Sequence, residues 1–503
     1  MSPREAYLAA RVLDALLRED YGRLSDRVSR SRDGVGLVLA GGRVVRLAPG
    51  GLFQDFVVAT GERPALREVL ATLAEVADPA DAEGVAAFGD ECAQALRAWE
   101  LHDDRAAAVL AAGPSYETLA AFADHPVYPT ARARLGLTEG ELLAYAPEFA
   151  PSFELRWAAV PRGMPLAGSA ELPADVAPPG LTAGADEVLF PVHPLAAGEV
   201  ARIDGVRLLD GAGLTVRPTL SMRTVEVAPR THLKLPLPTS TLGARNRRSI
   251  RPGTLEDGAR AELLLRRLAD PDVLVADEQT HAHAGHEYLA WMVRRLPAGV
   301  IVPVAALAVP GVLPRLDDVL GDGPGGVLSG YLRVLMRWNV RLFVRYGVAL
   351  EAHQQNLALV FHDGTMRLLV KDNDGLLASP ARLAAAGIEV PAFADERMLT
   401  DDPHALADVF VTITLHLAAA AVAFGALPHR EAAALVRDTL AEALDAYGDD
   451  PMARLLRART LEAARLTGKS MITAGTIVAK ERTGARDVNK FYGTSGPNYL
   501  RRA

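Results

Sequence analysis

The chain has 503 residues, half of them hydrophobic and 23% charged, with a formal net charge of −8. This composition indicates a folded globular protein with two or three subdomains, and the acidic balance argues against a general nucleic-acid binder. The single cysteine, Cys92, excludes an internal disulfide and a zinc site built from cysteines, so we interpret it as a small buried side chain.

Neither the N-terminus nor the longest apolar run indicates a membrane segment. The first twenty residues carry early charges and helical periodicity instead of the uninterrupted apolar region of a secretory signal. The longest apolar run, near residues 415–424, contains many alanines and is too short for a membrane span, which favours a buried helix. We therefore expect a cytoplasmic soluble protein that does not contact membranes.

Helical periodicity dominates the first 125 residues. Helices are predicted at residues 3–20, 64–77, 84–99, 103–112 and 115–123. A hairpin with Gly41-Gly42 at its turn interrupts them at residues 34–49. From residue 150 to 250, short β runs alternate with Pro and Gly, which is typical of an antiparallel sheet.

Helix returns in the second half of the chain. It is predicted at residues 256–268, 324–347, 403–425, 429–446 and 450–467, with β character at 298–309. We therefore predict an α+β fold with a helical N-terminal region (1–149), a β-rich central region (150–323) and a helical C-terminal region (324–503).

The most informative segment is a predicted hairpin at residues 351–375. Two apolar strands flank the turn Asp363-Gly364, and the polar residues before the first strand are Glu351, His353, Gln355 and Asn356. Asp372 and Asp374 follow the second strand, so Asn356 and Asp372 are expected to lie side by side. An amide oxygen beside a carboxylate suits Mg²⁺ that carries a nucleotide phosphate. The alternative is an ordinary hairpin with polar ends.

A second polar cluster spans residues 219–245. Ser221 and Arg223 are two residues apart on one predicted strand, and His232 and Lys234 have the same spacing on the next. If the strands pair, Arg223 and Lys234 can share a face and bind a phosphate, which Thr241 and Arg245 could extend. The alternatives are a solvated strand face and, for the cationic group, a simple surface patch of Arg245, Arg247, Arg248 and Arg251.

Two further segments carry histidine and arginine. In residues 125–136, His125, Arg132 and Arg134 lie on a proline-stiffened loop that could bind a carboxylate-rich substrate, or that could be a plain connection between helices. His193 lies between Val192 and Pro194, and a lone histidine in such a position is more often structural than catalytic.

Taken in order, these segments resemble the NRPS-independent siderophore (NIS) synthetase family of the IucA/IucC, aerobactin-synthetase type. The family pattern HPxHPxxKxRxG resembles residues 125–136, with Tyr128 in place of the second His and Arg132 in place of the Lys. Further matches are YAPEF at 145–149, SxRT at 221–224, KLPLPTSTLGAR at 234–245, HxQN at 353–356 and KDND at 371–374. The family's HPWQ resembles residues 193–196, where Leu195 and Ala196 depart.

The resemblance implies a cupped-hand fold with a helical thumb, β-rich fingers and a helical palm. It implies ATP-dependent adenylation of a carboxylic acid, most commonly citrate or a related acid in the family, followed by condensation with an amine or alcohol. Family members are often homodimers that act on small molecules, and no nucleic acid is implied.

The resemblance also assigns roles to residues. ATP phosphates would be bound by Ser221, Arg223, Thr224, Lys234, Thr241, Arg245 and His353, of which Arg223, Lys234 and His353 would be catalytic. Mg²⁺ would be held by Gln355, Asn356 and Asp372. Substrate contacts are expected from His125, Arg132, Arg134, Glu351 and Asp374, with Glu351 or Asp374 as the base that receives the proton of the amine.

Two other functions stay open on the sequence. A kinase-like phosphotransferase would form ADP, and the polar hairpin fits it equally well, although the chain lacks a glycine-rich phosphate loop. A degenerate, non-catalytic paralogue that binds a carboxylate is the third hypothesis, and the departure at Leu195-Ala196 is the feature that supports it.

Overall fold

The N-terminal region is a group of helices beside a small sheet. The computed structural model describes residues 2–32, 34–169, 171–211, 213–321, 323, 325–484 and 491–502. The helices here are α1 (Pro3–Glu19), α2 (Leu66–Val76), α3 (Ala82–Ala111), α4 (Tyr116–Ala120) and α5 (Glu139–Tyr145). The strands β1 (Val28–Ser31), β2 (Gly34–Val38), β3 (Val44–Pro49) and β4 (Phe56–Val58) form an antiparallel sheet in chain order.

The predicted hairpin and the buried cysteine are confirmed in this region, but one helix prediction is wrong. Gly41 and Gly42 both have positive φ between β2 and β3, and Cys92 is fully buried. The two helices predicted at 84–99 and 103–112 are a single helix, α3, because residues 100–102 contain no glycine or proline to break it.

The central region is built on antiparallel strands. A seven-stranded sheet has the order β5-β10-β11-β12-β15-β14-β7, and a second sheet has the order β8-β6-β9. Their bounds are β5 (Phe153–Glu154), β6 (Arg156–Pro161), β7 (Ala167–Gly168), β8 (Glu187–Val192), β9 (Arg207–Leu209), β10 (Thr215–Pro218), β11 (Thr224–Ala228), β12 (Thr231–Lys234), β14 (Asp277–His286) and β15 (Leu289–Arg295). The short helix α6 (Ala197–Val200) follows β8.

The sequence reading assigned no element to the two longest strands of this sheet, β14 and β15. Charged residues and histidines alternate with alanine along β14, so its hydrophobic pattern is weak although half of its positions are buried in the sheet.

The C-terminal region contains most of the remaining helices and the polar hairpin, and elements of residues 254–320 from the central region pack with it. The helices are α7 (Thr254–Leu268), α8 (Val312–Leu320), α9 (Gly326–Arg341), α10 (Pro380–Ala385), α11 (Pro403–Val409), α12 (Ala421–Ala426), α13 (His429–Asp445), α14 (Pro451–Arg457) and α15 (Lys480–Thr483). The strands are β13 (Val273–Val275), β16 (Val300–Pro303), β17 (Val348–Ala349), β18 (Leu357–His362), β19 (Thr365–Val370), β20 (Leu377–Ala378), β21 (Arg465–Gly468) and β22 (Thr494–Pro497). The α+β class predicted from the sequence is confirmed.

The hairpin of β18 and β19 forms as predicted. Asp363 and Gly364 both have positive φ, and His362 pairs with Thr365 across the turn. The strands β13 and β16, which are distant in sequence, flank the hairpin, so the sheet has the order β13-β19-β18-β16. The helix predicted at 450–467 ends early, because residues 465–468 pair with β22 instead.

The apolar run near residue 415 lies in the core. The helical stretch Pro403–Ala426 is long and apolar enough to cross a membrane by length and composition, but 78% of its most apolar window is buried inside the protein. All residues of its middle section, Phe410–Ala420, are buried. The interpretation as a buried helix is therefore confirmed.

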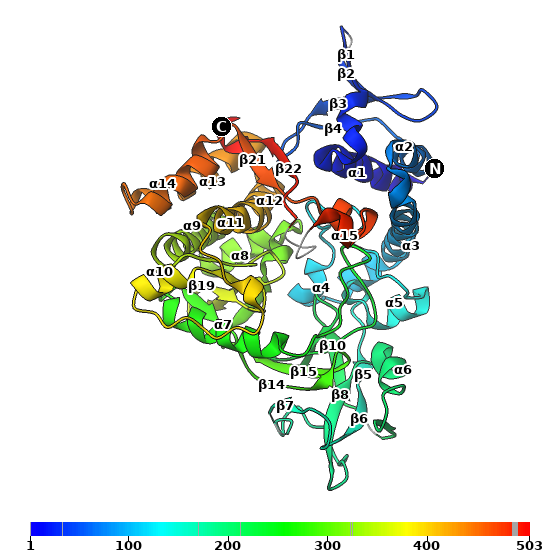
Figure 1. The fold of residues 1–503 in the computed structure, drawn as a ribbon, viewed down its shortest axis with the longest axis vertical. Helices are drawn as coiled ribbons and strands as arrows, with labels where there is room; N and C mark the ends of the chain where they lie inside the picture. The colour runs from blue at the N-terminus through cyan, green and yellow to red at the C-terminus, as the bar shows by residue number, and fades with distance from the viewer. Residues whose placement is uncertain are drawn as a thin grey trace.

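The three regions meet through one late segment, residues 469–484, which we call the bridge segment. It leaves β21 in the C-terminal region and continues to α15, which lies beside α3 of the N-terminal region (Figure 1). Its residues Ile472 and Ile477 belong to the same buried cluster as the helices α1 and α3. The bridge segment is therefore packed against the first helices of the chain.

His193, the isolated histidine between Val192 and Pro194, is structural. It is fully buried, packs edge-on against Tyr145 and Phe153, and its Nδ1 accepts a hydrogen bond of 3.2 Å from the Leu195 amide. Burial lowers the pKa of His193 from 6.5 to about 3, since a charged ring would have no partner there.

The pKa of His193 predicts an acid-sensitive fold. Because the folded state disfavours protonation, stability is complete above pH 6.5 and falls by up to ~1.4 kcal/mol per pH unit below it. A His193→Asn variant, whose side chain can still cap Leu195, should lose this part of the slope in urea unfolding at pH 7, 6 and 5. The exposed His362→Asn is the control; equal slopes in wild type and His193→Asn would contradict the assignment.

Candidate functional site

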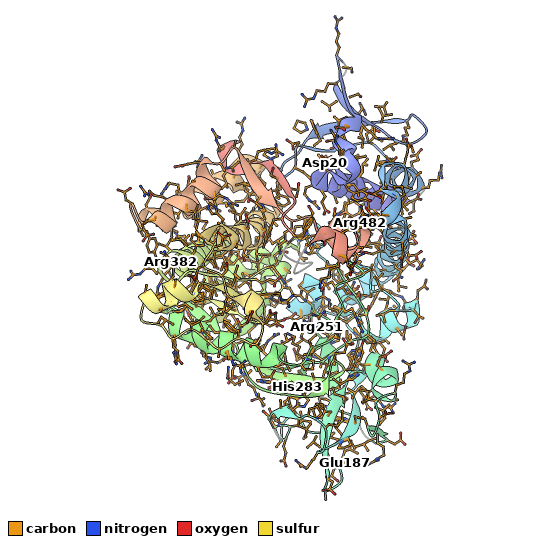
Figure 2. The ribbon with its side chains drawn as sticks, viewed as in Figure 1. Asp20, Glu187, Arg251, His283, Arg382 and Arg482 are labelled. Carbon is orange, nitrogen blue, oxygen red and sulfur yellow. The ribbon has the colours of Figure 1, made fainter. Side chains whose placement is uncertain are left out.

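A cleft with a volume of about 580 Å³ lies between the three regions. Figure 2 shows Arg251, one of its lining residues, near the centre of the molecule. Every candidate residue of the sequence analysis lines this cleft: His125, Arg132, Arg134, Ser221, Arg223, Thr224, Lys234, Thr241, Arg245, Glu351, His353, Gln355, Asn356, Asp372 and Asp374. Their assembly from segments up to about 250 residues apart makes the cleft the candidate active site.

The hairpin places Asn356 beside the start of the acidic element. Leu357 pairs with Val370, and one step further the Lys371 amide donates to the Asn356 carbonyl at 3.0 Å. The Asn356 amide nitrogen donates to the carbonyl of Glu351 at 3.1 Å, so its side-chain oxygen is the group left for a ligand. The expected proximity of Asn356 and Asp372 follows directly from this register.

Asp372 is held in an unusual backbone conformation. Its φ is +65°, which is costly for a residue with a β-carbon, and its amide donates to Glu278 Oε1 at 2.9 Å. The neighbouring Asn373 amide nitrogen reaches Glu278 Oε2 at 3.4 Å. The buried carboxylate of Glu278 therefore fixes the turn that aims Asp372 into the cleft.

Lys234 and Asp372 form the central ion pair. Lys234 is 2% exposed, and its Nζ lies 2.5 Å from Asp372 Oδ1 and 3.3 Å from Asp374 Oδ2. Burial opposes ionisation of Asp372, but Lys234, followed by Arg294 and Arg223, overcomes it and holds the pKa of this carboxyl well below its usual range. Asp372 is therefore an anion at neutral pH.

Ser221 and Arg223, which the sequence analysis proposed as phosphate-binding residues, are not on a strand, contrary to the prediction. Residues 219–223 form a turn between β10 and β11, in which Ser221 Oγ accepts from the Thr224 amide at 3.0 Å. The strands β11 and β12 do pair, but Lys234 stands opposite Thr224, and Arg223 stands opposite Leu235. Arg223 and Lys234 therefore reach the same cleft from a turn and a strand.

Arg248 is a cleft residue that the sequence analysis treated as part of a possible surface patch. Its Nε donates to Thr241 Oγ1 at 2.5 Å, and its Nη2 donates to the Thr241 carbonyl at 3.2 Å. Burial, and then the nearby positive charge of Arg223, lowers the pKa of Arg248 to about 9. Arg223 and Arg248 thus bring two cations to one cleft, an arrangement that can bind an anion.

The two cleft histidines are neutral hydrogen-bond donors. His353 Nδ1 accepts from the Gln355 amide at 3.3 Å, and His125 Nδ1 accepts from the Tyr128 amide at 3.0 Å. Burial, with Lys469 the next contribution, lowers the pKa of His353 to about 4, and burial followed by His353 lowers that of His125 to about 3. Each Nε2 therefore carries the proton and can donate it to an anionic oxygen.

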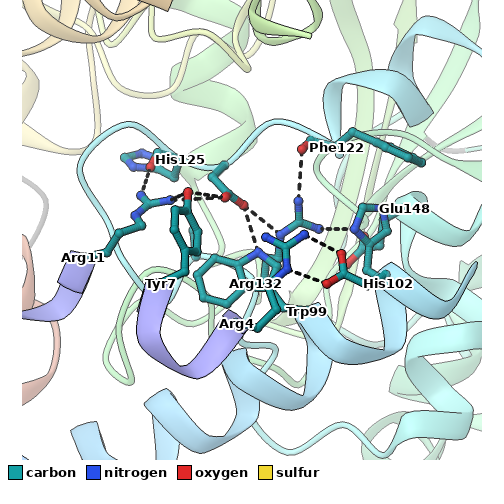
Figure 3. A network of polar contacts seen from close by, with 12 residues as sticks. Arg4, Tyr7, Arg11, Trp99, His102, Phe122, His125, Arg132 and Glu148 are labelled. Carbon is teal, nitrogen blue, oxygen red and sulfur yellow. Dashed lines mark hydrogen bonds and ion pairs between the residues drawn. The ribbon is translucent and has the colours of Figure 1, made fainter. Parts of the chain in front are cut away.

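The arginines of residues 125–136 are largely committed to internal contacts (Figure 3). Arg132 Nε lies 2.9 Å from Asp124 Oδ1, and its Nη2 donates to the Phe122 carbonyl at 3.1 Å. Arg134 donates to the Arg132 carbonyl at 2.7 Å and lies 3.4 Å from Glu148. Their substrate role stays a prediction, and the contacts show that Arg132 also ties this loop to the segment after α4 and Arg134 to the segment after α5.

Three of the four departures from the family pattern lie outside the cleft, and the fourth, Arg132, lines it. Tyr128 is fully buried in the N-terminal core, and Leu195 and Ala196 pack in apolar clusters beside the central sheet. None of the three is among the cleft-lining residues.

A second layer of buried charges was missed in the sequence. Lys371 Nζ lies 3.1 Å from Glu117 Oε1, whose other oxygen accepts from the Leu220 amide at 2.9 Å. Arg294 Nε donates to Glu278 Oε1 at 2.5 Å. Because Glu278 and Arg294 lie on β14 and β15, a period-two reading of residues 277–295 is the signal that could have found them.

The comparisons with known proteins agree with these motifs. Residues 115–309 match the model of the IucA / IucC family, and residues 328–477 match that of the ferric iron reductase FhuF-like transporter family. Relatives include staphyloferrin B synthase of Staphylococcus aureus, 25% identical over 55% of this chain and 56% of that protein. The rhizobactin siderophore biosynthesis protein RhbC of Rhizobium meliloti is 26% identical over 56% of this chain and 57% of that protein. The matches thus span about half the length of these curated relatives.

Solved structures extend the likeness to the whole fold. ATP-bound aerobactin synthetase IucA of Klebsiella pneumoniae is 19% identical with a TM-score of 0.70, over 98% of this chain and 99% of that one. Petrobactin biosynthesis protein AsbB of Bacillus anthracis is 15% identical with a TM-score of 0.77, over 100% of this chain and 96% of that one. The fold is that of the aerobactin synthetases, and residues 115–309 resemble the IucA / IucC family, as the sequence motifs indicated.

The contacts of Arg132 predict a structural effect of mutation. Arg132→Lys removes the planar fork that joins Asp124 and the Phe122 carbonyl, and it should lower the free energy of unfolding by ~1–3 kcal/mol in urea titration. Arg105→Lys, on an exposed position of α3, is the control. Unchanged stability with weakened substrate binding would instead assign Arg132 to the substrate.

Proposed function

We propose that this protein is an ATP-dependent ligase that adenylates a carboxylic acid and condenses it with an amine or alcohol in siderophore-type biosynthesis. The observation that carries the proposal is the convergence of Arg223, Lys234, Arg248 and the Asn356–Asp372 pair on one cleft in a chain that matches the IucA / IucC family model over residues 115–309. The siderophore names of the relatives support the pathway class, and citrate or a related polycarboxylate is the proposed acid. We place the enzyme in the cytoplasm, and the homodimer stays a prediction.

The phosphates of ATP would lie between the turn of residues 219–223, β12 and the 241–245 loop. Arg223 and Lys234 would neutralise the charge that grows on the phosphates as pyrophosphate leaves, and Thr241 and Arg245 would extend the contacts. His353 would donate its Nε2 proton to a phosphate oxygen, since its Nδ1 already accepts a hydrogen bond.

The donor set of the hairpin fits Mg²⁺ that arrives with ATP. Asp372 supplies an ionised carboxylate oxygen and Asn356 an uncommitted amide oxygen, both in the cleft, with the side chain of Gln355 beside them. Hard oxygen ligands, with only one or two carboxylates, suit a metal that is also bound by phosphates. The ion would supply further neutralisation of phosphate charge.

The first chemical step is attack of the substrate carboxylate on the α-phosphorus. An acyl-phosphate bond forms, the bond to pyrophosphate breaks, and the acyl-adenylate retains the AMP. The protein needs to align the two groups and exclude water, which the buried cations and neutral histidines of the cleft allow. His125, Arg132 and Arg134 line the cleft wall where the acid would bind.

The second step is attack of the amine on the activated carbonyl, with release of AMP. The nucleophile loses a proton, and Glu351 and Asp374 are the proposed acceptors because both carboxylates line the cleft beside the hairpin end. Asp374 Oδ2 also lies 3.3 Å from Lys234 Nζ.

Product analysis tests the reaction class. ATP consumption should depend on one acid from a panel of polycarboxylates and should form AMP and pyrophosphate, resolved from ADP and phosphate by chromatography. ADP would favour a phosphotransferase, and absence of turnover across the panel would favour an acid outside the panel or a non-catalytic paralogue.

Substitution of Arg223 tests the phosphate assignment. Arg223→Ala should lower kcat/KM for ATP by about 10²–10³, because removing one positioned donor from a developing anion typically costs ~3–4 kcal/mol. Arg217→Ala, on the exposed face of neighbouring β10, is the matched control. A loss below about threefold would contradict the assignment.

A further inference from the structure

The bridge segment joins the C-terminal core to the N-terminal helices. Leu466, just before it, belongs to the C-terminal core, whereas Ile472 and Ile477 within it belong to the N-terminal core. Three of its residues, Lys469, Met471 and Lys480, line the cleft. The segment therefore passes directly beside the candidate active site.

Glu19 at the end of α1 anchors the first half of the bridge segment. Its carboxylate is 7% exposed and accepts from the Ile472 amide at 3.0 Å, from the Thr473 amide at 2.8 Å and from Thr473 Oγ1 at 2.9 Å. Arg482 anchors the other end through Asp78, at 2.8 Å, and Asp81. Charge-assisted bonds at both ends fix the path of the segment.

The middle of the bridge segment touches its neighbours backbone to backbone. A β-carbon on Gly84 of α3 would lie 1.8 Å from the Ile477 carbonyl oxygen, and one on Gly243 would lie 2.9 Å from Gly475 Cα. The Arg245 amide donates to the Gly475 carbonyl at 3.0 Å. The bridge is thus clamped between α3 on one side and the 241–245 loop on the other.

One side chain connects both sides of this clamp. Thr476 Oγ1 donates to Glu91 Oε2 of α3 at 2.8 Å and accepts from the Ala244 amide at 3.0 Å. Thr130 Oγ1 donates to the other oxygen of Glu91 at 2.6 Å. Because Thr476 and Glu91 are each 1% exposed, no solvent competes, and the carboxylate fixes the hydroxyl so that its lone pair faces Ala244.

We infer that Thr476 is a positioning residue for the 241–245 loop, acting through the Ala244 amide 232 residues away in sequence. The loop carries Thr241 and Arg245 into the cleft, so its conformation sets where these side chains meet a phosphate. The effect on nucleotide affinity rests on the proposed function, whereas the effect on loop order does not.

The test compares Thr476→Val with Thr476→Ser and with a control. Valine keeps the branched shape of the threonine side chain but lacks its hydroxyl, whereas serine keeps the hydroxyl. Thr460→Val is the matched control, because Thr460 is also fully buried and, among the described residues, its hydroxyl donates to the Leu456 carbonyl within the same helical stretch. Amide hydrogen exchange of the peptide that contains residues 241–245 is measured without ligand, and ATP affinity is measured by titration calorimetry.

Thr476→Val should speed exchange in this peptide and weaken ATP binding about tenfold, the effect of one lost buried hydrogen bond. Its KM for ATP should rise with kcat nearly unchanged, since the loop binds ground and transition states alike. Thr476→Ser should match wild type in all three measurements.

Unchanged exchange and affinity in Thr476→Val, or the same changes in Thr460→Val, would overturn the inference. If Thr476→Val fails to fold, Glu91→Gln replaces it, since the amide keeps the size of the side chain but removes the charged acceptor. A wild-type protein that does not bind ATP would refute the proposed function, and the exchange measurement would still decide the role of Thr476.

Discussion

The contact between Lys234 and Asp372 is the constraint around which the cleft is organised. It joins β12 of the central sheet to the end of the hairpin in the C-terminal region, with the lysine 2% exposed. A buried charge without its partner is costly, of the order of several kcal/mol, so each side of the cleft requires the other. The positive φ of Asp372 persists because Glu278 and Lys234 hold the residue from two directions.

Two buried carboxylates near this ion pair, those of Glu117 and Glu278, each form hydrogen bonds or ion pairs that connect separate elements. Glu117 joins α4 to Lys371 and to the Leu220 amide, and Glu278 joins β14 to β15 through Arg294 and to the Asp372 amide. Such fully bonded networks rigidify a site at low dielectric, where a partly bonded one would destabilise it. The proposed adenylation would use this rigidity, because alignment and charge neutralisation supply most of the catalysis of such a step.

Buried carboxylates of the N-terminal region also hold a cleft loop in place, although they do so through the bridge segment and not by direct contact. Glu19 and Glu91, both buried, hold the bridge segment, and the bridge segment in turn holds the 241–245 loop. The last part of the chain thereby ties the first helices to the cleft. This arrangement explains why the loop residues of 125–136 and the C-terminal residues Lys469 and Lys480 line one cavity.

The sequence by itself determined the features that depend on local physics. The turn at Asp363-Gly364 and the pairing of its strands follow from neighbouring residues, and the order of the family motifs indicated the family and hence the α+β fold. The tertiary structure decided which charges meet. Whether Arg248 faces solvent or Thr241, and whether Arg132 faces a substrate or Asp124, depends on elements brought together across long separations. The end of the helix before β21 escaped prediction for the same reason, because residues 465–468 pair with β22. The strands β14 and β15 pair with each other, and they were missed because polar residues weaken the apolar pattern of β14.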